Sequence, residues 1–301
     1  MYTINNIAFE TYGITSGRID GSNIALSGQL DMPARLGKTF HDWTGEEGVE
    51  PYVLASEIRH GGRDLVFSGY VVATTKELAY TRLAEFYDAV KAYDDLVTLA
   101  TPYGSFEVYI NDQIEAEHLQ LGWLSIRITF REPVINFGAN LLSGTESAAY
   151  HIDGVSLKVL GAFVTRLNDN LSLPKPKAQN VTFYQTESYQ ITPASAHEFE
   201  AVLVFYADSY AQLAQHMQQL HKLLAAPGMR LINIDGIPRE CFNIKGVEVR
   251  NIKVASDFAM CEVTVPLMSK QTGKPLETGY LLDNEYNNIV TNLYELIKIY
   301  A

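Results

Sequence analysis

The chain repeats part of its own sequence, and this repeat limits the folds that are open to it. Residues 2–9 (YTINNIAF) and 150–157 (YHIDGVSL) share a tyrosine, an isoleucine, a turn pair and two apolar residues in the same order, 148 positions apart. Strand-like runs over 65–73 and 199–207 also resemble each other, 134 positions apart. Each run leads directly into a helical pattern. The repeat therefore predicts two tandem domains of one fold.

The two helical patterns fall at matching positions. Apolar residues recur in both at spacings of 4, 3 and 4, which places them on one helical face. They are Ala79, Leu83, Phe86 and Val90 in the first copy, and Leu213, Met217, Leu220 and Leu224 in the second. We expect a helix over 76–93 in the first copy, and in each copy a helix packed on its own sheet. Closing strands are expected over 124–130 and 259–265.

Glycine and small polar residues mark the boundary between the copies. The pattern predicts a first domain over 1–135, a linker over 136–149, a second domain over 150–268 and a C-terminal arm over 269–301. In the arm, Asp283 is a plausible N-cap for a helix running towards Tyr300. This helix either packs on its own domain or docks on a neighbouring subunit. The expected fold class is mainly β with α (α+β): two β-sandwich or barrel domains, each with one packed helix, plus the C-terminal helix.

Composition excludes several classes of protein. The 301 residues are 47% hydrophobic, which is too high for a disordered chain, and no run approaches the ~20 apolar residues needed to span a membrane. The N-terminus lacks the pattern of a signal peptide. A net charge of −12 argues against a nucleic-acid reader that neutralises phosphates. The two cysteines, Cys241 and Cys261, are expected to be ordinary buried thiols.

The residues that could carry chemistry do not form a recognisable site. His216 and His221 are five residues apart, off a shared helical face, and both are expected to be exposed. No phosphate-binding glycine loop or nucleophile elbow is present. The sequence therefore predicts no catalytic residues, no metal and no cofactor.

A long connection over 31–48 distinguishes the first copy from the second. It carries large aromatic groups together with an arginine, a composition typical of interface cores. We expect it to contact a neighbouring subunit through Arg35, Phe40, His41 and Trp43. The alternative is a loop folded onto its own domain, with Trp43 covering the core. The equivalent segment of the second copy, 173–177 (LPKPK), is expected to be an extended, stiff crossing.

The loop and the elements around it resemble a known family. Pro33, Arg35 and Gly37 form a Pro-x-Arg-x-Gly core, followed by a hairpin, one helix and closing strands. This order is similar to the tail-tube fold of long-tailed bacteriophages, in particular to the N-terminal domain of distal tail proteins. The resemblance covers residues 1–135 directly and 150–268 through the repeat. The second half departs from the family, because many members carry a galectin-like domain there.

The resemblance implies a structural, non-enzymatic role at a phage tail tip. It implies a ring that continues the tail tube, connects it to the baseplate or tail fibre, and leaves a lumen for DNA passage without specific binding. Implied partners are further copies of the chain, as a hexamer or a pseudo-hexameric trimer, with tail tube and tail tip proteins. The location would be the virion, after synthesis in the host cytoplasm. We expect acidic side chains to face the bore. Two alternatives stay open: a component of a phage-derived injection apparatus, or a soluble sugar-binding β-protein or enzyme.

Overall fold

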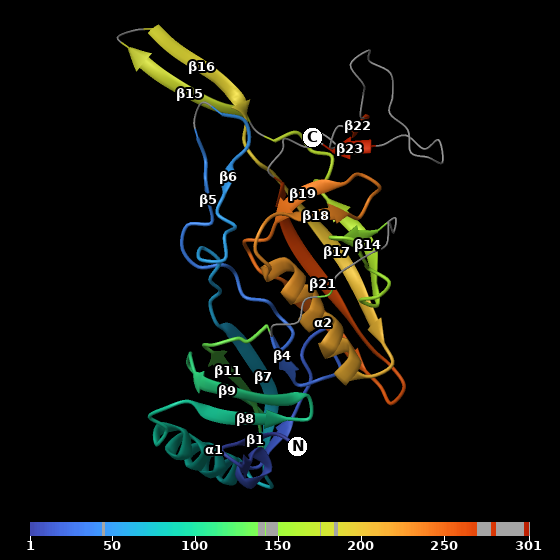
Figure 1. Cartoon of the computed structure of the whole chain (residues 1–301). Coiled ribbons are helices and arrows are strands. Elements are labelled where there is room, and N and C mark those ends of the chain that lie inside the picture. Colours follow the sequence, from blue (N-terminus) through green and yellow to red (C-terminus); the bar gives the residue numbers. More distant parts are fainter. Residues whose placement is uncertain are drawn as a thin grey trace, which may run out of the picture.

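The computed structural model describes residues 1–43, 46–137, 142, 150–174, 176–183, 186–269, 278–280 and 298–300. Within these residues the chain is mainly β and forms two sheet domains, each with one α-helix (Figure 1). No helix among the described residues is both long and apolar enough to cross a bilayer.

The first domain is a nine-stranded sheet with the order β2-β1-β8-β9-β11-β7-β3, to which β10 and β4 add at β11 and β7. Helix α1 packs on it. Its elements are β1 (Thr3–Ile4), β2 (Ile7–Ala8), the 3-10 helix η1 (Phe9–Tyr12), β3 (Ile14–Ser16), β4 (Leu26–Ser27), β7 (Arg63–Val72), α1 (Lys76–Lys91), β8 (Val97–Thr101), β9 (Gly104–Ile110), β10 (Glu115–Gln120) and β11 (Trp123–Glu132).

The second domain repeats this order strand for strand, as β13-β12-β18-β19-β21-β17-β14 with β20 added at β21. Its elements are β12 (His151–Ile152), β13 (Val155–Ser156), β14 (Ala162–Asn168), β17 (His197–Ala207), α2 (Tyr210–Ala225), β18 (Arg230–Asn233), β19 (Arg239–Phe242), β20 (Glu248–Val254) and β21 (Ala259–Ser269). The expected duplication is therefore confirmed at the level of strand order.

Three separate two-stranded hairpins complete the described elements. They are β5 (Phe40–His41) with β6 (Glu50–Pro51), β15 (Pro176–Phe183) with β16 (Thr186–Ala194), and β22 (Thr278–Tyr280) with β23 (Lys298–Tyr300). In Figure 1 the β15–β16 hairpin projects away from both domains, and β5 and β6 lie between it and the first domain.

Small backbone details match as well as the strand order. Val72 donates its N–H to the carbonyl of Gly13, and Tyr206 donates to Gly161, both at 2.9 Å. Gly13 and Gly161 both have positive φ, and a Cβ on either would collide with the helix of its own domain. Each helix begins at a hydroxyl cap, Thr75 for α1 and Ser209 for α2. These equivalences are hard to reach without a common ancestral unit.

Each sheet wraps around its own core. β7 pairs with one edge of β11 over ten residues. On the other edge, β10 pairs with the first half of β11 and β9 pairs with its last residues. This sharing turns the sheet, so that Phe67, Leu99 and Ile128 from separated strands meet in one buried cluster. The same sharing occurs at β21.

The predicted helical faces are confirmed. Ala79, Leu83 and Phe86 of α1 are buried, and Val90 is partly buried against the same core. In α2 all four predicted residues are buried. Helix α1 ends at Lys91, two residues before the predicted end.

One sequence prediction is wrong, and another is tested only at its end. The predicted C-terminal helix lies mostly outside the described residues, but its end, Lys298–Tyr300, pairs as a strand with Thr278–Tyr280. The prediction that both His216 and His221 are exposed is wrong: His221 is buried and His216 is half-buried. Helix α2 buries a wider face than α1 because Leu30 of the first domain joins the core around it. Most of the predicted linker, 138–141 and 143–149, is outside the described residues.

Candidate assembly surfaces

The first domain covers the outer edge of strand β20 in the second domain. Asn23 is central: its N–H donates to the carbonyl of Ile252 (3.1 Å), and its side-chain amide exchanges two hydrogen bonds with the backbone of Val254 (2.8 and 2.9 Å). Ser22 accepts the N–H of Ile252 through its hydroxyl, at 3.0 Å. The unpaired groups of an edge strand are thus satisfied from within the chain.

A second set of contacts continues this joint. Met32 and Val247 form an isolated antiparallel bridge, with backbone hydrogen bonds of 3.0 and 2.9 Å. The Asp31 carboxylate accepts the N–H of Val249 at 2.9 Å. Ile24, Leu30 and Met32 belong to the buried core of the second domain, although the chain reaches them before β7 of the first. We call residues 22–32 the joint segment.

The Asp31 carboxylate predicts a measurable pH dependence. Burial raises the pKa of Asp31 to about 6, against the lowering effects of the Val249 N–H and the Arg63 charge. The folded chain therefore holds this proton more tightly than the unfolded chain. Its contribution to stability is greatest below about pH 4 and is lost as the pH rises through about 6.

Asp31→Asn should keep the acceptor for Val249 while removing the buried charge. We expect the free energy of unfolding at pH 7 to rise by roughly 1–3 kcal/mol, with a smaller difference at pH 4. Urea unfolding at both pH values measures this, with the exposed Asp20→Asn as the control. A loss of stability at pH 7 would contradict the prediction.

The connection of the first domain and the β15–β16 hairpin of the second project together. We call the described residues of 38–51 and 176–194 the arm, which is distinct from the C-terminal arm over 269–301. Lys177 of β15 is nearly buried and donates to three carbonyl oxygens, those of Trp43, Glu46 and Gly48, at 2.6–2.9 Å. It also forms an ion pair with Asp42. Gly48 donates its N–H to the carbonyl of Ala194 at 3.0 Å. One lysine thus fixes the turn of the connection against the hairpin.

The four predicted interface residues divide into two pairs. Arg35 is buried and donates to the carbonyl of Tyr52, and Phe40 packs on Phe242, so both hold the connection in place. His41 and Trp43 lie further along the arm, with ring centroids 4.0 Å apart. Trp43 donates to Glu50 at 2.8 Å and is about half exposed. The alternative in which Trp43 covers the core is therefore wrong.

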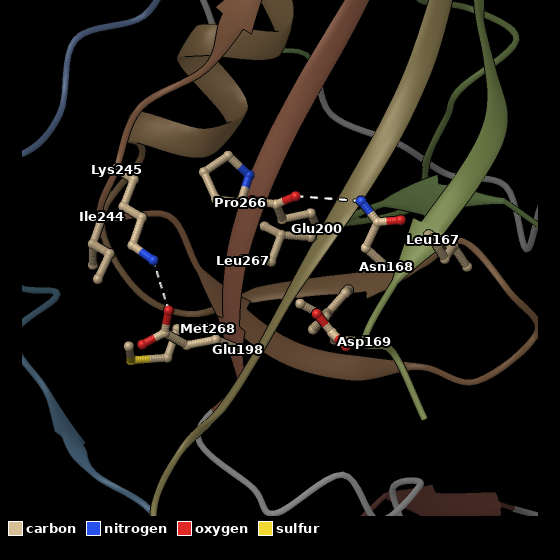
Figure 2. Close-up of a pocket in the computed structure, with 11 residues that line it drawn as sticks. Leu167, Asn168, Asp169, Glu198, Glu200, Ile244, Lys245, Pro266, Leu267 and Met268 are labelled. Atoms are coloured by element: carbon tan, nitrogen blue, oxygen red, sulfur yellow. Dashed lines mark hydrogen bonds and ion pairs between the residues drawn. The ribbon is translucent and has the colours of Figure 1, made fainter. Parts of the chain in front are cut away.

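A hollow of about 580 Å³ lies where β14, β17 and β21 meet the loop after β19 (Figure 2). Lys245 pairs with Glu198 at 2.7 Å, and Asn168 donates to Glu200 at 3.3 Å. Asp169 adds a third acidic group. This lining pairs no nucleophile with a general base, and among the described residues no group of three or more possible ligands could hold a metal ion.

Other titratable groups are held in neutral forms by burial. Burial raises the pKa of Cys241 and of Cys261 to about 12, so neither thiol ionises near neutral pH. The prediction that both are buried is confirmed. Burial also lowers the pKa of His221 to about 3, with the charge of Arg63 acting in the same direction. The joint segment, which the sequence pattern did not predict, is the main feature that the structure adds.

Comparison with known proteins finds similarity to solved structures alone. No protein-family model matches, and no curated protein matches. Among solved structures, the chain is similar to the Dit protein of phage SPP1, described as a paradigm of the hub adsorption apparatus in phages that infect Gram-positive bacteria. The two are 8% identical, with a TM-score of 0.34, and the match covers 89% of this chain and 98% of the other. At this TM-score, the conclusions about fold rest on the strand order itself.

Proposed function

We propose that the chain is a structural component of a bacteriophage tail tip, assembling with further copies of itself into a ring that continues the tail tube. The observation that carries this proposal is the joint between two equivalent sheet domains, in which one unit covers the strand edge of the next. A unit that binds its own repeat edge-on is suited to a closed ring, because cyclic contacts satisfy edges and stop growth. The Pro33-x-Arg35-x-Gly37 loop and the order of elements support the same role.

The ring would surround a lumen through which DNA passes. The net charge of −12 suits a wall that repels phosphates rather than binding them. Partners would be the tail tube protein and tail tip or baseplate proteins, and the location would be the virion. The chain would act without catalysis, cofactor or metal.

The arm is the surface we assign to contacts with other subunits or tail proteins. Arg35 and Phe40 would hold it in position, and His41 and Trp43 would make the contact. Half-exposed aromatic side chains that are fixed by hydrogen bonds lose little entropy on binding, which favours such a role.

Electron microscopy and native mass measurement of the purified chain test the proposal. We expect rings with a central hole and a mass that is a whole multiple of 33.6 kDa. Duplex DNA should not bind in a gel-shift assay at moderate salt. A compact monomer at every concentration would contradict the proposal.

A further inference from the structure

The joint segment of the first domain has a counterpart in the second. β4 pairs Leu26 with Phe67, and β14 pairs Leu167 with Ala201 at the equivalent place. Both strands then enter the same type of turn. The backbone N–H of Asp31 donates to the carbonyl of Gly28, and the backbone N–H of Ser172 donates to the carbonyl of Asp169, each at 3.0 Å. Gly28 and Asp169 both have positive φ. Residues 28–32 therefore correspond to 169–173.

The apolar residues of the two segments have opposite surroundings. Leu30 and Met32 are 5% and 3% exposed, because they are inserted into the second domain. Their counterparts, Leu171 and Leu173, are 80% and 85% exposed. The second domain thus carries two leucines where the first has a leucine and a methionine, but in the described part of the chain no domain receives them.

The receiving edge is also duplicated. Val249 of β20 pairs with Val263, and Ala116 of β10 pairs with Ile126 at the equivalent place. The pairing shifts register between Arg250 and Lys253 in β20 and between His118 and Gln120 in β10. Because the two shifts fall at the same place, Ile252 corresponds to Leu119 and Val254 corresponds to Leu121. By the same offset, Val247 corresponds to Ile114.

The edge of the first domain is uncovered where that of the second is covered. Ile252 is buried under the joint segment, whereas Leu119 and Leu121 are 51% and 80% exposed. Every residue of β10 is exposed, and within the described part of the chain no strand pairs with its outer edge. Exposed apolar groups beside unpaired backbone mark a binding site for another segment.

We propose that the outer edge of β10 binds residues 169–173 of a second copy of this chain, repeating between chains the contact that joins the two domains within one. Leu173 would pair its backbone with Ile114 as Met32 pairs with Val247, and Leu171 would lie near Ala116, the counterpart of Val249. The inference rests on the proposed ring and names the surfaces that close it. A contact between unlike surfaces of identical chains propagates in one direction and generates a ring when its rotation closes.

The contact between chains differs from the internal joint in one respect. The first domain has nine residues, 17–25, between β3 and β4, and these supply Ser22 and Asn23. In the second domain β14 is continuous apart from a register shift between Val164 and Arg166, so this loop has no counterpart. The contact between chains therefore lacks the Asn23 and Ser22 hydrogen bonds and is expected to be weaker than the internal joint.

Cysteine cross-linking tests the assignment. Residues in an antiparallel bridge with two backbone hydrogen bonds have Cα atoms about 5.5 Å apart, within the range of a disulfide. Leu173→Cys and Ile114→Cys chains, mixed and oxidised mildly, should give a reducible dimer. Each single variant alone should not, because Cys241 and Cys261 are buried. Leu54→Cys, at an exposed leucine outside both surfaces, replaces Leu173→Cys in the control mixture.

Charge substitution gives an independent readout. Leu171→Asp and Leu173→Asp should leave the circular dichroism spectrum unchanged, since both side chains are exposed in the single chain. The concentration needed for half-assembly should rise roughly tenfold or more, as expected for losing one buried leucine at an interface. Leu54→Asp should leave it unchanged.

The outcomes separate this inference from the proposed function. Rings that survive Leu171→Asp and Leu173→Asp, with no link between positions 173 and 114, would overturn the edge assignment and leave the ring intact. A chain that stays monomeric at every concentration would overturn both. A 173–114 link together with loss of rings in the aspartate variants would support both.

Discussion

Gly246→Ala should weaken the joint between the two domains by roughly 2–5 kcal/mol, from steric overlap together with left-handed backbone strain. Gly246 has φ +77, and a Cβ there would lie 2.0 Å from the carbonyl oxygen of Met32. The backbone cannot retreat easily, because Asn243 holds both the N–H and the carbonyl of Gly246 at 2.9 and 2.8 Å. The bridge between Met32 and Val247 would therefore open.

A matched glycine separates the two causes. Gly236 has φ +86, yet a Cβ there would meet nothing within 4 Å. Gly236→Ala should cost only the strain of the left-handed backbone, about 1–2 kcal/mol. Urea unfolding measures the stability of both variants, and hydrogen exchange at the Met32 and Val247 amides reports on the joint. Equal losses in the two variants, or unchanged exchange in Gly246→Ala, would contradict the steric argument.

Features that depend on local periodicity could be predicted from the sequence. The 4-3-4 spacing in both helices located the buried faces of α1 and α2, and the repeat predicted two domains of one order. The exception on α2 is His221, which is buried because the other domain packs beside it. A single helical pattern contains no information about a second covering surface.

The joint could not be predicted in this way, because its partners are far apart in sequence. Asn23 and Val254 are 231 residues apart, and neither lies in a motif. One signal was available: the copies differ in length between the strands equivalent to β3 and β4, at residues 17–25. An insertion in one copy of a repeat indicates a contact that the other copy does not make. Lys177 likewise lies in a proline-containing segment whose pattern indicates an extended chain but not the carbonyl groups it binds.

The arm shows how composition can indicate burial without naming the partner. The aromatic content of residues 31–48 predicted a contact, and Phe40 does contact Phe242, but of the same chain. Arg35 is likewise used internally. What remains for other proteins is the outer part of the arm, around His41 and Trp43, and its role there stays a prediction.

Phe86→Ala should lower the free energy of unfolding of the first domain by about 3–5 kcal/mol, the range for deleting a buried aromatic ring. The side chain is fully buried, and its ring lies 5.9 Å from that of Phe9 and 5.4 Å from that of Tyr12, in edge-on arrangements. Because these partners come from η1, the loss would detach the N-terminal segment from α1. The cavity left by the deleted ring can collapse only partly, because the sheet of the first domain packs tightly beside α1.

The second domain offers an equivalent variant for comparison with Phe86→Ala. Leu220 occupies the equivalent position in α2 and is also fully buried, so Leu220→Ala should cost about 2–5 kcal/mol in the second domain. Trp123 lies in β11 of the first domain, and a Trp43→Phe background removes the tryptophan of the arm, which Lys177 of the second domain also holds. Phe86→Ala should therefore shift the fluorescence transition to lower denaturant than the circular dichroism transition, and Leu220→Ala should do the reverse. Glu85→Ala, an exposed neighbour on the same helix, should change stability by less than about 0.5 kcal/mol. A loss that small in Phe86→Ala would show that this face of α1 does not hold the domain together.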